Sequence, residues 1–182
     1  MLQLKDRLEA TALDGYRLAL SQADILTKSG EADIICPART LLEISRSLTG
    51  EEEEITLYTQ GGMLLVRIGD MTIVSRLYQG DFIRKESVLP TEFSTTVTLS
   101  KAELCESVER AAIFIRGDKN NLVTLTIANS AVKIASVSEI GNVSESVHAE
   151  IEGKELSISM NAKYLLDALR ALDEEQVVMQ YN

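Results

Sequence analysis

The sequence is poor in the residues that mark specialised classes of protein. Its 182 residues include two cysteines, two prolines, one histidine and no tryptophan. Cys36 and Cys105 fall in no CxxC or other ligand spacing, so we interpret both as reduced thiols that bind no metal. No apolar run approaches the roughly 18 residues that a membrane span needs, and the first residues lack the apolar stretch of a signal peptide. We therefore expect a cytoplasmic protein with no membrane, metal or cofactor.

Catalytic signatures are equally scarce. The chain contains no GxGxxG, no GxxxxGK[ST], no HExxH and no GxSxG. The one histidine, His148, lies in an alternating segment typical of a strand, and any Ser-His-Asp arrangement would depend on it alone. Paired carboxylates such as Glu150 and Glu152 are expected by chance among 28 acidic residues. The sequence therefore favours a binding protein over an enzyme.

Acidic residues outnumber basic ones by 28 to 18, which gives a formal net charge of −10. Such a charge opposes binding to nucleic acid, because affinity for a phosphate backbone comes mostly from Lys and Arg. That inference holds only for charge that is spread evenly, since one face can still carry a basic stripe. The positions of the basic residues therefore matter more than their sum.

Turn and capping signals predict an α+β chain. Asp14-Gly15 between two alternating runs predicts a tight type I′ turn, in which both central residues need a positive φ. Helices are expected at 38–48 after Pro37, at 101–115 after the Ser100/Glu103 capping box, and at 162–172 after Asn161. A turn is expected at 117–121. Strands are expected at 7–13, 16–20, 34–36, 54–59, 63–68, 71–78, 95–99, 122–128, 131–137, 143–151, 155–160 and 176–181.

The chain contains an internal repeat. Residues 37–48 align without gaps with residues 161–172, and each copy reads as a cap, a helix, an acidic turn (51–54 and 173–175) and a strand. We expect a domain boundary at 90–95, which separates domains 1–93 and 94–182. The last strand has no partners after it, so the C-terminus looks truncated.

The two repeated helices carry matching charges. A basic, an acidic and a basic residue recur at i, i+4 and i+7, which puts them on one face: Arg39, Glu43 and Arg46, and Lys163, Asp167 and Arg170. The opposite, apolar stripe is expected to consist of Leu41, Leu42, Ser45 and Leu48, and of Leu165, Leu166, Leu169 and Leu172. Spacing alone favours a solvated charged face. The alternative is a helix directed at a phosphate backbone.

Five motifs in order carry a family resemblance. They are residues 12–19 (ALDGYRLA), the Pro37 helix, residues 74–77 with Gly80 and Phe82, residues 88–90 (VLP), and residues 161–169. Together the motifs resemble the bacterial DNA polymerase III beta subunit, the sliding clamp. That family has three clamp domains per chain, and two chains close head to tail into a ring with strands outside and helices around duplex DNA. The resemblance implies tandem clamp domains, the second without its first helix and the third without its last strands.

The resemblance also implies roles for particular residues. Arg39, Arg46, Lys163 and Arg170 become candidates for non-specific phosphate contact in the channel. Ile113 and Phe114 match the contact that closes the homodimeric ring. The family pocket takes a short peptide from the DNA polymerase III alpha subunit, the clamp loader and other proteins with a clamp-binding motif. Its implied residues here are Leu13, Gly15, Tyr16, Arg17, Leu18, Ile83, Val88, Asn161 and Tyr164.

One segment departs from the family pattern, and two alternatives remain. The common Phe-Pro-Asp-Tyr reads Phe-Ile-Arg-Lys at 82–85, so Ile83 replaces a proline of the pocket wall. One alternative is a small α+β enzyme with a site at the domain junction near Tyr16, Arg17 and Tyr164. The other is a clamp fragment that functions in no assembly.

Overall fold

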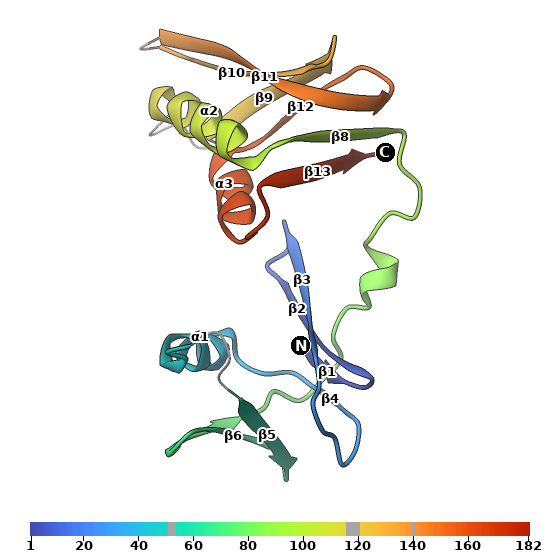
Figure 1. Cartoon of the computed structure of the whole chain (residues 1–182), viewed down its shortest axis with the longest axis vertical. Helices are drawn as coiled ribbons and strands as arrows, with labels where there is room; N and C mark the ends of the chain where they lie inside the picture. Colours follow the sequence, from blue (N-terminus) through green and yellow to red (C-terminus); the bar gives the residue numbers. More distant parts are fainter. Residues whose placement is uncertain (51–53, 116–120, 140) are drawn as a thin grey trace. The chain divides into compact units, whose positions relative to one another are not determined.

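The computed structural model describes residues 1–50, 54–115, 121–139 and 141–182. Its chain divides into two compact units, Met1–Leu89 and Pro90–Asn182, and each is described by itself. Figure 1 labels most of the elements of both units, which combine helices with antiparallel sheets. The predicted α+β class is therefore confirmed.

The described residues of the first unit form two sheets and one α-helix. One sheet has the order β3-β2-β1-β4, the other has the order β5-β6-β7, and all pairs are antiparallel. The buried core joins α1 to both sheets through Leu2, Ile34, Ile44, Leu64 and Val66. The elements are β1 (Leu2–Leu4), β2 (Arg7–Leu13), β3 (Leu18–Asp24), β4 (Ala32–Ile34), α1 (Ala38–Ser47), β5 (Ile55–Gln60), β6 (Met63–Ile68), β7 (Met71–Arg76) and the 3-10 turn η1 (Lys85–Ser87).

The loop between β2 and β3 corrects the predicted two-residue turn. Leu13 pairs with Leu18, so four residues, 14–17, connect the strands. Only Gly15 in this loop has a positive φ, 87°. The Asp14 carboxylate accepts hydrogen bonds from the backbone N–H groups of Tyr16 and Arg17, both at 3.1 Å. This Asx-type turn satisfies the loop backbone without a type I′ geometry, and Tyr16 therefore lies outside the strand predicted for it.

The second unit has one six-stranded antiparallel sheet in the order β12-β9-β10-β11-β8-β13. Strand β11 is longer than predicted because it pairs with β10 along its first half and with β8 along its second. Helix α2 packs on β10 and β11 and lies next to α3 (Figure 1). The elements are β8 (Thr95–Ser100), α2 (Lys101–Phe114), β9 (Leu122–Ala128), β10 (Ala131–Ser138), β11 (Gly141–Gly153), β12 (Leu156–Asn161), α3 (Ala162–Arg170) and β13 (Gln176–Tyr181).

The predicted helix caps are present. The Ser100 hydroxyl accepts from the backbone N–H of Glu103 at 3.3 Å, and the Asn161 side chain accepts from that of Tyr164 at 3.2 Å. Each bond satisfies one of the N–H groups that a helix start leaves without a partner. The helices end one or two residues before their predicted ends, and β4 ends at Ile34, two residues before the strand predicted to reach Cys36.

The predicted apolar stripe is partly right for each of the two repeated helices. Leu166 and Leu169 of α3 are buried. In α1 the buried residue is Ile44, whereas Leu42, Ser45 and Leu48 are exposed. Leu172, also predicted to be apolar-facing, is exposed. Of the predicted turns, residues 51–53 of the acidic turn and 117–120 of the second loop lie outside the described residues.

Candidate functional sites

The basic residues predicted on α1 lie on its exposed surface. Arg39 and Arg46 are both exposed, and the guanidinium of Arg46 lies 3.1 Å from the carboxylate of Glu43, one turn earlier. Arg46 belongs to the last turn, where a cation interacts favourably with the negative end of the helix dipole. An exposed pair of this kind contributes about 0–1 kcal/mol, so the guanidinium can exchange this carboxylate for another anion.

The corresponding residues of α3 are also exposed, but one is engaged by a neighbouring helix. Arg170 donates to the carboxylate of Glu109 on α2 at 2.7 Å, and this hydrogen bond raises the pKa of Arg170. Lys163 is exposed on the first turn of the helix. Helix α2 itself contains two basic residues, Lys101 and Arg110, and three glutamates. The basic surface of the second unit is therefore narrower than the spacing on α3 alone predicts.

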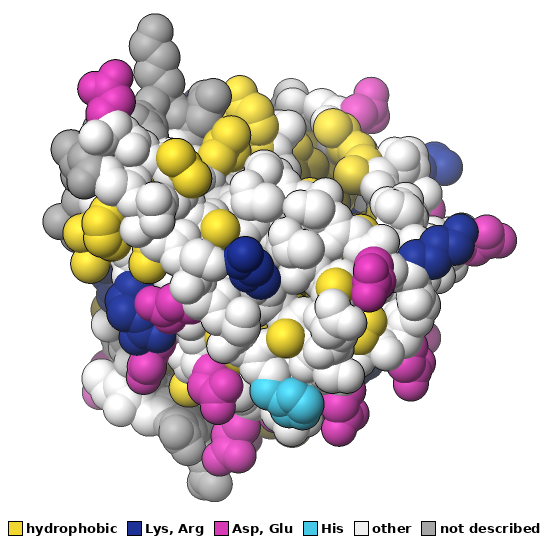
Figure 2. Space-filling view, turned by 90° about the horizontal axis from the view of Figure 1, so that it is seen from above, with side chains coloured by type: hydrophobic (Ala, Val, Ile, Leu, Met, Phe, Trp, Pro, Cys, Tyr) yellow, Lys and Arg dark blue, Asp and Glu magenta, His cyan; other side chains and the backbone are white. Residues whose placement is uncertain are grey.

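Charge elsewhere on the surface follows the acidic composition. The face in Figure 2 carries acidic side chains at several places around its margin and basic side chains that stand singly, one of them near the centre. His148 is exposed on β11, as the strand pattern predicts for it. Such a face offers few of the cations that phosphate contact requires.

The end of the β2–β3 hairpin brings together five residues predicted for the peptide pocket. They are Leu13, Gly15, Tyr16, Arg17 and Leu18. Arg17 Nε lies 3.0 Å from the carboxylate of Asp14. Hydrogen bonds from the Tyr16 backbone, and then from Arg17, hold the pKa of Asp14 below its ordinary value. The loop therefore keeps a charged carboxylate that fixes Arg17 beside the exposed Tyr16 ring.

The remaining residues predicted for that pocket lie on two other segments. Ile83 and Val88 belong to the segment 80–89, and their side chains are 52% and 53% exposed. Asn161 and Tyr164 lie at the start of α3, where the cap joins them. The structure thus places the pocket residues in three local groups, two in the first unit and one in the second.

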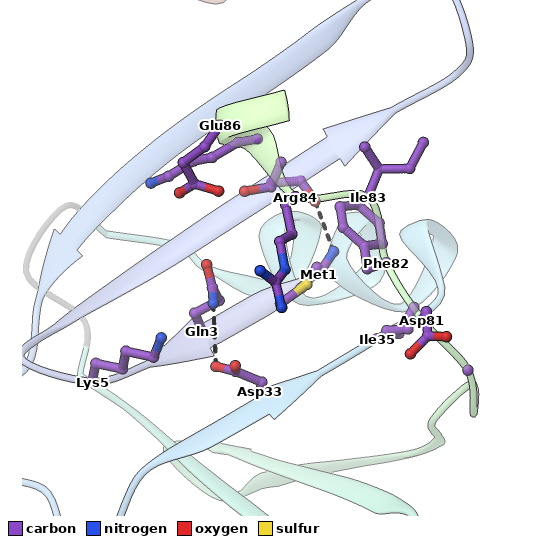
Figure 3. A pocket seen from close by; sticks show the side chains of 13 residues that line it. Met1, Gln3, Lys5, Asp33, Ile35, Asp81, Phe82, Ile83, Arg84 and Glu86 are labelled. Carbon is purple, nitrogen blue, oxygen red and sulfur yellow. Dashed lines mark hydrogen bonds between the residues drawn. The ribbon is translucent and has the colours of Figure 1, made fainter. Parts of the chain in front are cut away.

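The first unit also contains a hollow of about 460 Å³ that sequence reasoning missed. Its floor is the polar face of β1, β2 and β4, and the segment 80–86 lies over it. Figure 3 shows Arg84 extending across the hollow toward Gln3, whereas Ile83 points away from it. The alternation of Glu9 and Thr11 with apolar residues along β2 could have predicted this polar face. The segment that covers the face lies about 70 residues further along the chain, so the sequence around β2 could not predict it.

The residues predicted to close a ring lie at the end of α2. Ile113 is exposed, and Phe114 is partly buried next to Gly141. One turn before them, Arg110 donates to both carboxylate oxygens of Glu145 on β11, at 2.8 and 2.7 Å. This forked pair raises the pKa of Arg110 and lowers that of Glu145. It ties the end of α2 to the sheet and so holds Ile113 in place.

Three further features of the described residues concern metal ligands, thiols and helix length. The described residues contain no group of three or more His, Cys, Asp and Glu side chains placed to hold a metal ion. Cys36 and Cys105 are free, and burial raises the pKa of both thiols, which keeps them in the less reactive protonated form near neutral pH. None of the helices among the described residues is long and apolar enough to cross a bilayer.

Comparison with known proteins matches both units. Residues 86–182 match the family of the DNA polymerase III beta subunit, C-terminal domain, and residues 2–83 match its central domain. The chain is 30% identical over 178 residues to the beta sliding clamp of Staphylococcus epidermidis, and the match covers 97% of this chain and 47% of that protein. A similar match, 30% over 179 residues, is found with the clamp of Staphylococcus aureus. The chain spans about half the length of the curated relatives it matches.

Solved structures have the same fold. The DNA polymerase sliding clamp from Bacillus subtilis superimposes with a TM-score of 0.94 at 29% identity, over 100% of this chain and 49% of that one. The DNA polymerase III subunit beta from Pseudomonas aeruginosa gives a TM-score of 0.91 at 29% identity, over 100% and 50%. The clamp fold expected from the sequence motifs is therefore confirmed for both units.

Proposed function

The chain belongs to the DNA polymerase III beta subunit family, and on that premise we propose that it forms part of a DNA sliding clamp, a processivity factor that binds and does not catalyse. In this proposal residues 1–93 are the second clamp domain and residues 94–182 the third. The parent assembly is a head-to-tail homodimeric ring around duplex DNA in the cytoplasm. Ile113 and Phe114 belong to the contact that closes it.

One observation supports DNA binding most strongly. Two helices at equivalent positions of the repeat expose basic residues at the same spacing, in a chain whose net charge is −10. Contacts between such side chains and phosphates are long-range, independent of base sequence and sensitive to salt. A protein that slides needs contacts of this kind, because they hold the duplex without fixing a register. The acidic remainder of the surface repels DNA and so favours binding at the helices.

The proposal includes a second kind of partner. The hairpin end with Tyr16, the segment with Ile83 and Val88, and the start of α3 with Asn161 and Tyr164 would receive a short hydrophobic peptide. Its sources would be the DNA polymerase III alpha subunit, the clamp loader and other proteins with a clamp-binding motif. Ile83 and Val88 are both exposed within one short segment, which supports this role because exposed large apolar side chains mark interaction sites when they lie together.

The DNA part is tested by binding to labelled duplexes of two unrelated sequences across a series of salt concentrations. One variant replaces Arg39, Arg46, Lys163 and Arg170 with Gln. We expect the unaltered chain to bind both duplexes equally. In the variant, the slope of log K against log salt should fall by about 0.9 for each phosphate contact removed.

The matched control replaces four exposed basic residues outside the helices, two in each unit, with Gln: Arg67, Arg76, Lys133 and Lys154. Its charge change is the same, so we expect a much smaller change in slope. Equal losses in the two variants would reject the helices as the binding face. No binding by the unaltered chain at low salt would reject DNA binding by this chain altogether.

A further inference from the structure

Glu9 and Lys85 form an ion pair whose side chains are largely buried. The Lys85 ammonium lies 2.5 Å from the Glu9 carboxylate, and their side chains are only 28% and 12% exposed. Gln22 of β3 donates a further hydrogen bond to Glu9 at 2.9 Å. The hydrogen bond from Lys85 makes the largest contribution, and together the two bonds hold the pKa of Glu9 below its ordinary value. Glu9 therefore stays ionised at neutral pH, and its partner lies 76 positions further along the chain.

Lys85 also organises the backbone around it. Its carbonyl oxygen accepts from the backbone N–H groups of Val88 and Leu89, at 3.0 and 2.9 Å. The hydroxyl of Ser87 donates to the carbonyl of Arg84 at 2.7 Å. These bonds build η1, with Ile83 before it and Val88 after it. When Lys85 is bound to β2, both apolar side chains are held pointing outward, and each is more than half exposed.

Other attachments of this segment to the sheet are sparse. The segment enters at Tyr78, whose backbone N–H donates to the carbonyl of Ile35 at 2.8 Å. Between that bond and Lys85 the space beneath the chain is the polar hollow of Figure 3, not a packed core. The segment buries little apolar surface over such a hollow apart from the partly buried Phe82, so the ion pair is a principal attachment of the segment.

We propose that Glu9 and Lys85 are positioning residues for the peptide-binding site. Their ion pair fastens the segment 80–89 to β2 and thereby presents Ile83 and Val88 to the hydrophobic side chains of a partner peptide. This inference rests on the proposed function for its ligand, whereas the attachment itself rests on contacts within the first unit. Lys85 lies in the segment whose sequence departs from the common family pattern. The ion pair therefore attaches this segment to β2 through a residue that the common pattern does not contain.

The first measurement is amide hydrogen exchange in the full chain. Glu9→Gln keeps the shape of the side chain and removes its charge, and Lys85→Met removes the other partner. Because an unpaired buried charge is strongly disfavoured, we expect Val88 and Leu89 to exchange at least about tenfold faster in both variants. The amides of Leu64 and Val66, in the core of the same unit, should exchange at unchanged rates. Unchanged exchange at Val88 and Leu89 would overturn the attachment.

The second measurement is the affinity of each variant for the isolated DNA polymerase III alpha subunit. We expect Glu9→Gln and Lys85→Met to weaken binding about tenfold, and Lys85→Arg, which keeps the charge, to restore most of it. Glu31→Gln is the control, because Glu31 pairs with Lys28 on the exposed surface. Normal binding by Glu9→Gln would overturn the positioning role alone. Absence of binding by the unaltered chain would overturn the peptide part of the proposed function as well.

Discussion

Asp14 sets the geometry of the β2–β3 loop with its own carboxylate. A side chain that accepts from the N–H groups two and three residues further on competes with the backbone turn that Asp-Gly otherwise favours. The same residue then pairs with Arg17, so one carboxylate orders most of the hairpin end. Local hydrogen bonding of this kind decides between turn types that differ little in energy, and the Asp-Gly signal by itself does not resolve them.

Gly153 permits the sharpest prediction for a single residue. Its φ is +109°, and an added Cβ would lie 2.1 Å from the carbonyl oxygen of Ser94. We expect Gly153→Ala to lower the free energy of unfolding of the second unit by about 3 kcal/mol or more, because backbone strain and overlap add together. Urea-induced unfolding, monitored by the amide hydrogen exchange of β8 and β11, measures this change in free energy. Gly30→Ala, where an added Cβ meets nothing within 4 Å, should cost little, and equal costs would contradict the account.

The two repeated helices align in sequence, yet they bury different positions. Leu42 and Leu166 occupy equivalent positions, yet Leu42 is 49% exposed and Leu166 is 7% exposed. Helix α2 packs beside α3 in the second unit. The described residues of the first unit contain α1 as their one α-helix, and it buries Ile44 against the sheets. The buried face of a helix thus depends on its neighbours as much as on its own period.

This difference predicts unequal effects of the same substitution. Leu166→Ala should lower the free energy of unfolding of the second unit by about 2–5 kcal/mol, because it removes a buried side chain and leaves a cavity. Leu42→Ala should change that of the first unit by about 1 kcal/mol or less, since half of the side chain already contacts solvent. Amide exchange resolved by unit measures both values. Equal costs would mean that the helix faces are assigned wrongly.

Elements with strong local signals were predictable from the sequence, and those built from distant contacts were not. The caps at Ser100 and Asn161 follow from hydrogen bonds between residues three apart. Strand β1 is three residues long, too short to display a period of two. The Glu9–Lys85 and Arg170–Glu109 pairs join residues 76 and 61 apart, so no window of sequence contains them. The caps were thus predictable from the sequence, but the distant partners that restrain charged side chains were not.

At the scale of the whole molecule, charge distribution matters more than net charge. A chain of net charge −10 is a poor candidate for a DNA-binding protein by composition alone. The exposed cations of α1 and α3 change that judgement because they recur at equivalent positions of two units that match the same family. Glu43 and Glu109 pair with two of these cations, and in the proposed function such pairing would let the protein release a duplex easily.

The most direct test of this account is NMR of the 20.0 kDa chain during titration with a short duplex at low salt. Amide shift changes report which surface meets the DNA, without any substitution. We predict that the changes concentrate in α1 and α3, near Arg39, Arg46, Lys163 and Arg170, and that they fade as salt is added. Changes confined to strands β5–β7 or β9–β12, or no changes at the lowest salt, would contradict the proposal that the repeated helices form the DNA-binding face.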